Sequence, residues 1–220
     1  MDRKLVTLVK NQISLPTVLP QISKDLQQRI ALVRENLGNY GQFVLRFNPD
    51  IQNSIANLRA GYVECWNMKY PSLNLIGHTY GNEQVVEWLK IQFFDLNNFV
   101  GVKEKMSDKQ LTDVANLFYC DCYNLNISEV ALFFLNYKLG KFGEFYGIVD
   151  PLKIMTAKNK FLAERITALN RNRERMQQER ENEQRDNREQ IKNAILAHNA
   201  EKREKALNTK KKWLRMDLIR

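Results

Sequence analysis

Hydrophobic residues recur at helical spacing along most of this chain. The clearest stripe consists of Val85, Trp88, Leu89, Phe93 and Leu96. Neighbours three or four residues apart share one face of an α-helix, so this stripe predicts an amphipathic helix over residues 82–99. A second stripe of the same kind consists of Leu111, Val114, Ala115, Phe118 and Cys122. The segment 127–139 is apolar on nearly every side, which predicts the central buried helix.

Two helix starts carry capping boxes. Ser107 is followed three residues later by Gln110, and Asn126 is followed by Glu129 in the same way. In such a box each side chain accepts a hydrogen bond from the backbone N–H of the other residue, which satisfies groups that a helix start leaves unpaired. The second stripe and the central helix therefore begin at defined residues.

Other boundaries follow from serine, proline and glycine. Ser23 caps a predicted helix that runs to Asn36 and ends at Gly38. The segment Asn48–Asp50 places a proline next to capping side chains, and it predicts one helix that continues toward Met68.

The predicted fold class is all-α, a compact helical bundle from which a long charged C-terminal helix projects. Gly77 and Gly81 flank a predicted short connector between two helices. Leu5–Val9 and Gln42–Phe47 are open alternatives as short strands, but no repeat or strand-rich region competes with the helical pattern.

The C-terminal third contains no Gly and no Pro from residue 152 to residue 220. Asp150 followed by Pro151 caps and starts a long predicted helix. Its first turns present an apolar stripe to the bundle, formed by Ile154, Met155, Phe161, Leu162, Ile166 and Leu169. Beyond this stripe, Met176 is the only sizeable apolar side chain in 171–190. If it is helical throughout, this segment would extend on the order of 100 Å.

We therefore expect three parts of the chain. Residues 1–47 form an N-terminal segment that packs on the core, residues 48–169 form the helical core domain, and residues 170–220 form a charged, basic tail that is helical or disordered. The tail has too few apolar side chains to belong to a packed core.

Nearly all of the net charge of +9 lies in the tail. Residues 165–220 hold 16 Lys and Arg against 9 Asp and Glu, whereas residues 1–164 hold 18 against 16. A polycation releases counterions from a phosphate polymer, so nucleic acid is the first expected partner and an anionic membrane surface the second. The alternative is that interspersed charges only stabilise a lone helix, through pairs such as Glu181 with Arg185, Arg185 with Glu189, and Glu201 with Lys205.

The side chains expected to contact nucleic-acid backbone all lie in the tail. They are Arg171, Arg173, Arg175, Arg180, Arg185, Arg188, Lys210, Lys211, Lys212, Trp213 and Arg215. The last of these belong to an amphipathic end with Leu207, Leu214 and Leu218 on one face. Four roles stay open for this end: it docks on a partner protein, stacks on a base, rests on a membrane surface or folds back on the domain. A heptad repeat that starts at Leu169 has polar residues at its core positions, so a dimeric coiled coil through 170–190 is not expected.

The densest local signal is the segment Lys138–Gly147, which holds three glycines beside two lysines and three aromatic residues. One interpretation is a nucleic-acid or partner-binding loop, in which Lys138, Lys141, Phe142 and Tyr146 make the contacts. The other interpretation, which we favour, is a tight turn between helices whose aromatic side chains fill the core. A phosphate-binding P-loop is not indicated, because no Ser or Thr follows Gly-Lys.

A resemblance is carried by residues 129–134, Lys138, Gly140, Gly143, Phe145–Gly147 and Asp150-Pro151, followed by a charged helix. This pattern resembles an uncharacterised family of small proteins from phages and mobile elements, over about 106–165. That family has no assigned catalytic residues, so the resemblance implies no catalytic site. More distantly, a helical bundle that ends in a basic segment is similar to phage helicase-loader and replisome-organiser proteins, which implies a role in DNA replication.

The sequence does not predict an enzyme. His78 and His198 are the only histidines, and no Ser-His-Asp or Cys-His arrangement can be assembled around them. Cys120 and Cys122 are two residues apart on a predicted helix and point about 200° away from each other, which makes a poor shared metal site. We expect no catalytic residue, no metal and no cofactor.

The location is predicted from absences in the sequence. No run of 18 apolar residues is present, so no transmembrane segment is expected. Three cysteines form no disulfide framework, and no export signal is recognisable, which is typical of a reducing cytoplasm.

Two functions remain. In the first, the chain is a non-enzymatic, nucleic-acid-associated accessory protein of a phage or mobile element in the bacterial host cytoplasm, acting in DNA replication: its domain binds a partner protein and its tail binds nucleic-acid backbone. In the second, it is a phage structural or assembly protein, present in the virion, whose long helix mediates protein contacts.

Overall fold

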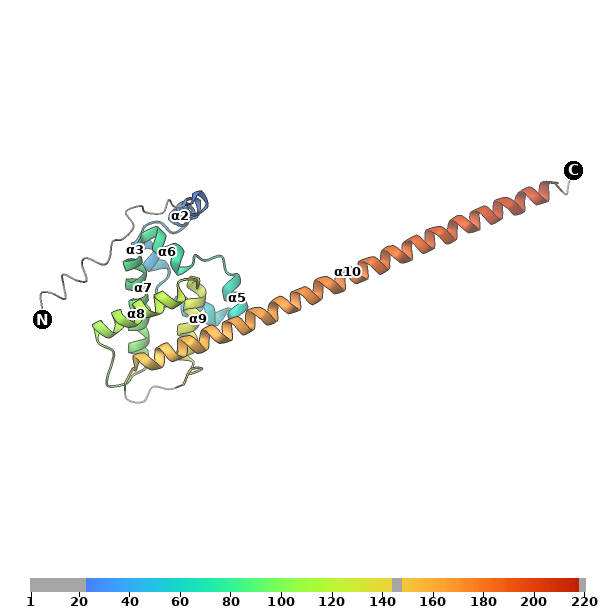
Figure 1. Ribbon diagram of the computed structural model, residues 1–220. Helices are drawn as coiled ribbons and strands as arrows, with labels where there is room; N and C mark the ends of the chain where they lie inside the picture. The colour runs from blue at the N-terminus through green and yellow to red at the C-terminus, as the bar shows by residue number, and fades with distance from the viewer. Residues whose placement is uncertain (1–22, 144–147, 218–220) are drawn as a thin grey trace, which may run out of the picture. The chain divides into compact units, whose positions relative to one another are not determined.

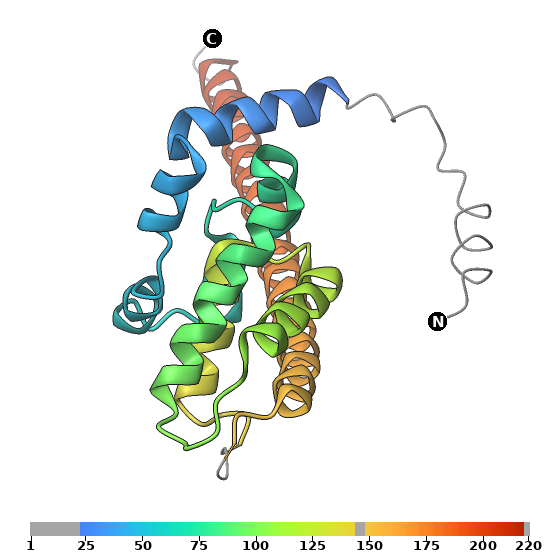
Figure 2. The same cartoon turned by 90° about the vertical axis from the view of Figure 1, so that its left-hand side faces the viewer.

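The structure is a computed structural model that describes residues 23–143 and 148–217, without the side chains of 206 and 209–217. It is all-α, as predicted (Figures 1 and 2). The helices are α2 (Lys24–Leu37), α3 (Tyr40–Arg46), α4 (Ile51–Asn57), α5 (Tyr62–Asn67), α6 (Leu73–Tyr80), α7 (Asn82–Phe99), α8 (Asp108–Cys122), α9 (Ile127–Lys138) and α10 (Pro151–Asp217). The described residues form no β-strand and only two isolated bridges, Ser72 with Asn126 and Glu104 with Ile148. The possible strand Leu5–Val9 lies outside the described residues.

The chain divides into two compact units, Met1–Phe161 and Leu162–Arg220. Helix α10 runs without interruption through the boundary and contributes Pro151–Phe161 to the first unit. Its 67 residues confirm the prediction of a long C-terminal helix.

In the first unit, α9 is the central helix, as predicted. Ten of its 12 residues are buried, and it packs against α4, α5 and α7. Helix α7 also packs against α6 and α8, and α2 packs against α6. In Figure 2 the green α7 and the yellow α9 lie side by side. The predicted stripes of α7 and α8 are buried at every position named above.

Aromatic side chains join these helices. The ring centroids of Phe93 and Phe134 are 4.9 Å apart, and those of Phe118 and Phe133 are 5.1 Å apart. Phe161 of α10 reaches Phe133 at 5.6 Å, edge to face. Such pairs contribute about 0.5–1.5 kcal/mol beyond the burial of their area. The start of α10 is thereby tied to the centre of the bundle.

The predicted caps are present. Ser107 and Asn126 each accept from the backbone N–H three residues later, and Gln110 and Glu129 accept from the backbone N–H of their respective caps. Ser23 accepts from Leu26 N at 3.2 Å. Asp150 accepts from the backbone N–H of Leu152 at 2.8 Å. Local sequence therefore fixes where these helices begin.

The single helix predicted from Asn48 toward Met68 is wrong. The chain forms α4 and α5 instead, separated by a turn at which Arg59 has a φ of 50°. The backbone N–H of Ala60 donates to Ile55 O and that of Arg59 donates to Ala56 O, which is the Schellman arrangement. The sequence did not predict this break because the left-handed position is occupied by arginine rather than glycine.

One smaller prediction is also wrong, and one alternative is excluded. The connector expected between Gly77 and Gly81 is the second half of α6, and Gly77 is buried inside that helix. A Cβ at Gly77 would lie 2.3 Å from Tyr119 Oη and 2.5 Å from Asn82 Oδ1, so this glycine serves close packing and not a turn. The possible strand Gln42–Phe47 lies almost entirely in α3, which an asparagine capping box starts.

The apolar stripe at the start of α10 ends earlier than predicted. Ile154 and Phe161 are fully buried, and Met155, Leu162 and Leu169 are half-buried. Ile166, expected on the buried face, is 56% exposed. The buried face also includes Lys158, whose ammonium group pairs with Asp121. No described residue beyond Phe161 is buried.

Candidate nucleic-acid interface

The expected tail contacts lie on α10. The side chains of Arg171, Arg173, Arg175, Arg180, Arg185 and Arg188 are all exposed. Lys210–Lys212, Trp213 and Arg215 also fall in α10, but their side chains lie outside the described residues. Six of the predicted contacts can therefore be placed in space.

Few of these arginines are neutralised by a neighbour. Arg175 Nε lies 3.8 Å from Glu179 Oε1, and its Nη2 donates to Asn172 Oδ1 at 2.9 Å. Within the described part of the chain, the other five predicted arginines form no ion pair or hydrogen bond through their side chains. Their guanidinium groups remain available to an external anion.

Only one of the three ion pairs predicted to support the tail helix forms. Lys205 Nζ lies 2.5 Å from Glu201 Oε1. Arg185 pairs with neither Glu181 nor Glu189 among the described contacts, so those two predictions are wrong. Glu181 instead accepts from Gln177 Nε2 at 2.9 Å. Exposed pairs of this kind contribute about 0–1 kcal/mol, which is too little to hold two long side chains in one geometry.

The described side chains of this unit are nearly balanced in charge. Residues 162–205 hold 11 Lys and Arg against 9 Asp and Glu, whereas 206–220 hold 5 against 1. An average positive charge therefore does not make 162–205 a nucleic-acid surface. What matters is how the charges are arranged around the helix.

That arrangement is uneven. Because each residue advances the helix by about 100°, nine positions fall within about 80° of one another. They are Arg173, Gln177, Arg180, Gln184, Arg188, Ile191, Ile195, His198 and Lys202, and all are exposed. We call this set the acid-free face, since it contains four cations and no carboxylate. Glu181 borders one edge of this face and accepts from Gln177, so phosphates meet no negative side chain along the face itself and along its other edge.

The acidic residues gather elsewhere on α10. Five of them fall within about 60° of one another on a different side of the helix. They are Glu179, Glu183, Asp186, Glu201 and Glu204. The predicted contacts Arg171, Arg175 and Arg185 lie on a third side, which they share with Glu189. Only three of the six placed arginines therefore belong to a purely basic surface.

Sequence reasoning missed this division, although the signal was present. The spacing of Arg173, Arg180, Arg188 and Lys202 is visible in the sequence, and the face follows once 171–205 is known to be one regular helix. Net charge does not distinguish one side of a helix from another.

The predicted loop contacts behave differently. Lys138 Nζ lies 2.5 Å from Asp95 Oδ2 and 5.1 Å from the ring centroid of Phe99, so its charge is satisfied internally. Phe142 is half-buried and stacks on Phe133 at 5.8 Å. Lys141 is exposed, and Tyr146 lies outside the described residues. The packing of Phe142 agrees with the core-filling interpretation of this turn.

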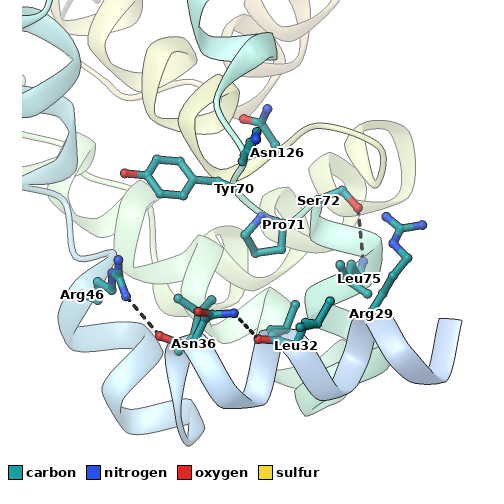
Figure 3. A pocket seen from close by; sticks show the side chains of 12 residues that line it. Arg29, Leu32, Asn36, Arg46, Tyr70, Pro71, Ser72, Leu75 and Asn126 are labelled. Carbon is teal, nitrogen blue, oxygen red and sulfur yellow. Dashed lines mark hydrogen bonds between the residues drawn. The ribbon is translucent and has the colours of Figure 1, made fainter. Parts of the chain in front are cut away.

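A basic groove on the first unit was not predicted (Figure 3). It has a volume of about 620 Å³ and is lined by Arg29 of α2, Arg46 of α3 and Lys69, together with apolar side chains such as Leu32 and Leu75. No acidic residue lines it. These three cations are far apart in sequence and line one groove only through the packing of α2, α3 and α6. No local sequence pattern therefore predicts the groove.

The polar groups of the groove are engaged to different degrees. Asn126 Nδ2 donates to Cys65 O at 2.9 Å, and Ser72 Oγ accepts from Leu75 N at 3.3 Å, so both serve the fold. Arg46 Nη1 donates to Asn36 O at 3.2 Å. Neither Arg29 nor Lys69 has a side-chain partner among the described residues. The groove therefore offers positive charge beside an apolar floor.

The described residues provide little for catalysis or metal binding. No group of three His, Cys, Asp or Glu side chains that could hold a metal ion occurs among them. Cys65 is buried, and burial, followed by Glu129 and Glu64, raises the pKa of its thiol to about 12. A thiol that stays protonated at neutral pH is a poor nucleophile. His78 is exposed on α6, and Cys120 is exposed while Cys122 is buried.

No helix in the described part of the chain is both long enough and apolar enough to cross a membrane.

The comparisons with known proteins give one match. Residues 105–211 match a family of unknown function, DUF6633. The match includes the whole segment that carries the resemblance described above, so that part of the chain does resemble a family without an assigned function. No curated protein and no solved structure matches the chain.

Proposed function

We propose that this protein is a non-enzymatic, nucleic-acid-associated accessory protein of a phage or mobile element. The observation that carries the proposal is the acid-free face of α10, on which Arg173, Arg180, Arg188 and Lys202 are exposed without an intervening carboxylate. Arginine side chains bind phosphate oxygens through paired N–H groups. Cations on one side of a helix fit the backbone of a nucleic acid and read no bases.

The process in which we place this activity is DNA replication in the bacterial host cytoplasm, where the protein would act in the manner of a helicase loader. In this scheme the helical unit binds a partner protein while α10 holds the nucleic acid. The basic groove between α2, α3 and α6 gives the helical unit a positively charged surface of its own. No cofactor is required for either contact.

A salt titration tests the proposal. Four phosphates neutralised on duplex DNA give a slope of about −3.6 in log affinity against log salt, so affinity should fall about 150-fold between 50 and 200 mM salt. On single-stranded DNA the slope should be about −2.8, which corresponds to a fall of about 50-fold. Gel-shift titrations of the full chain with both forms measure these values. Binding that is absent at 50 mM salt, or that does not weaken with salt, contradicts the proposal.

A second function is favoured by the aliphatic side chains of α10, two of which belong to the acid-free face. Ile191, Ile195, Leu196 and Leu207 are each more than half exposed on α10. Exposed aliphatic side chains of this kind can pack against another protein, as required of a phage structural or assembly protein in a virion. Light scattering of the purified chain, alone and with the products of neighbouring genes, tests this function, and a strict monomer that binds none of them excludes it.

A further inference from the structure

A second cavity lies in the first unit and shares no lining residue with the basic groove. It has a volume of about 340 Å³ and is formed by the turn between α4 and α5 and by the end of α9. Figure 1 shows α5 and α9 as neighbours, and the two helices are in contact. Its walls are largely aliphatic and include Ile55, Leu132 and Leu135.

The amide of Asn136 is the first unusual feature of this cavity. Asn136 lines the cavity, is only 1% exposed, and its Oδ1 has no hydrogen-bond partner. Buried polar atoms are almost always paired, because an unpaired one loses its water without compensation. The fold therefore keeps an acceptor without a partner beside the cavity. Oδ1 has almost no exposed surface, so the amide must turn for its oxygen to reach the cavity, where a ligand that donates a hydrogen bond would satisfy it.

Arg59 is the second unusual feature. It lines the same cavity and occupies the left-handed position of the Schellman turn, with a φ of 50°. Glycine or asparagine is the usual residue at such a position, because a longer side chain is strained there. Strain that persists in a native structure often marks a site with a function. The strained residue in this turn is a cation at the edge of a cavity.

Lys141 provides a second cation. It lines the cavity from the turn that follows α9, and it is exposed. Neither Arg59 nor Lys141 has a charged side-chain partner among the described residues, and no acidic residue lines the cavity. Two uncompensated cations at one cavity attract an anion.

We propose that this cavity binds one nucleotide, with the base between the aliphatic walls against Asn136 and the phosphate between Arg59 and Lys141. Every nucleobase has an N–H group on its edge that can donate to the amide oxygen. The volume is at the lower end of the range for small-molecule sites, which suits a single nucleotide unit. This site goes beyond the proposed function, because it involves a different unit and none of the cations of α10.

The same chemistry has two sources, a free nucleotide and the terminal nucleotide of a single strand. Isothermal titration of the full chain with AMP, GMP, CMP and UMP addresses the first source. A 5′-phosphorylated tetranucleotide, titrated in the same buffer, addresses the second. Adenosine and inorganic phosphate are the matched ligands that lack one half of the nucleotide, and each should bind at least tenfold more weakly.

Three substitutions locate the site. Asn136→Leu, Arg59→Gly and Lys141→Gln should each weaken nucleotide binding at least tenfold. The first two should leave the midpoint of thermal unfolding unchanged or raise it, because one removes an unpaired polar group and the other removes a strained side chain. A loss of binding without a loss of stability separates a ligand site from a folding defect. Lys69→Gln, which changes a cation of the basic groove, is the control and should bind nucleotide normally.

The outcomes are distinct from those of the salt titration. A variant with Arg173, Arg180 and Arg188 changed to glutamine should still bind the nucleotide, whatever happens to its binding of long DNA. Binding by the tetranucleotide alone assigns the site to a strand end, and binding by free nucleotides assigns it to a small molecule. If no nucleotide and no tetranucleotide binds, or if binding survives all three substitutions, the proposal is overturned.

Discussion

The sharpest prediction concerns the side of α10 that contacts nucleic acid. We compare two triple variants of the full chain that remove the same charge. The first changes Arg173, Arg180 and Arg188 of the acid-free face to glutamine. The second changes Arg171, Arg175 and Arg185, which lie on the side shared with Glu189. Arginine and glutamine have nearly equal helix propensity, so α10 should remain helical in both.

The magnitude follows from the number of phosphates lost. Each phosphate contact on duplex DNA contributes about 0.9 to the slope of log affinity against log salt. Removing three contacts should therefore make the slope shallower by about 2.7. Both chains should lose affinity between 50 and 200 mM salt. The fold-decrease for the acid-free-face variant should be about 40 times smaller than that for the parent chain. The variant with changes at Arg171, Arg175 and Arg185 should keep most of the parental slope.

Fluorescence anisotropy with a labelled duplex at 50, 100 and 200 mM salt measures these slopes, and circular dichroism checks the helix content of each variant. A simple polycation effect predicts equal losses, because both variants lose three charges. Equal slopes would therefore refute the assignment of the contact to one face, and parental slopes in both would show that these arginines do not bind DNA.

Four further predictions concern the helical unit. Gly77→Ala should change the urea midpoint little, because the new methyl group displaces only the exposed hydrogen bond between Tyr119 Oη and Asn82 Oδ1 while alanine gains about 1 kcal/mol of helix propensity; a loss above about 2 kcal/mol would show that these two side chains cannot move aside. Phe161→Ala should cost about 3–5 kcal/mol, because a fully buried ring is removed from the aromatic core, and a loss below 1 kcal/mol in the same assay would contradict that role. Maleimide should label Cys120 first, since Cys65 is buried with a thiol pKa of about 12. Because this folded pKa lies above the ordinary thiol value of 9.0, the unfolded chain loses the proton first, so the contribution of Cys65 to stability should fall as pH rises above 9. Tyrosines with raised pKa values titrate in the same range, so the loss is measured as the difference between the parent and Cys65→Ala in their urea midpoints at pH 8 and pH 10.

The elements that the sequence determined depend on local chemistry. A capping box such as Ser107 with Gln110 needs only residues three apart, and the apolar stripes of α7 and α8 need only helical spacing. The all-α class, the buried position of α9 and the long helix that follows Pro151 are all consequences of such short-range patterns. They could be predicted because each pattern is complete within about 20 residues of chain.

Tertiary structure decided what depends on residues that are distant in sequence. Gly77 was predicted as part of a connector, yet it is a packing residue because Tyr119 and Asn82 approach it. The groove exists because α2, α3 and α6 bring Arg29, Arg46 and Lys69 together. The strain at Arg59 and the unpaired amide of Asn136 are properties of one cavity that two distant segments form. A sequence shows which charges and polar groups a chain carries. Only packing decides which of these groups are left without a partner, because the fold determines which side chains lie beside each of them.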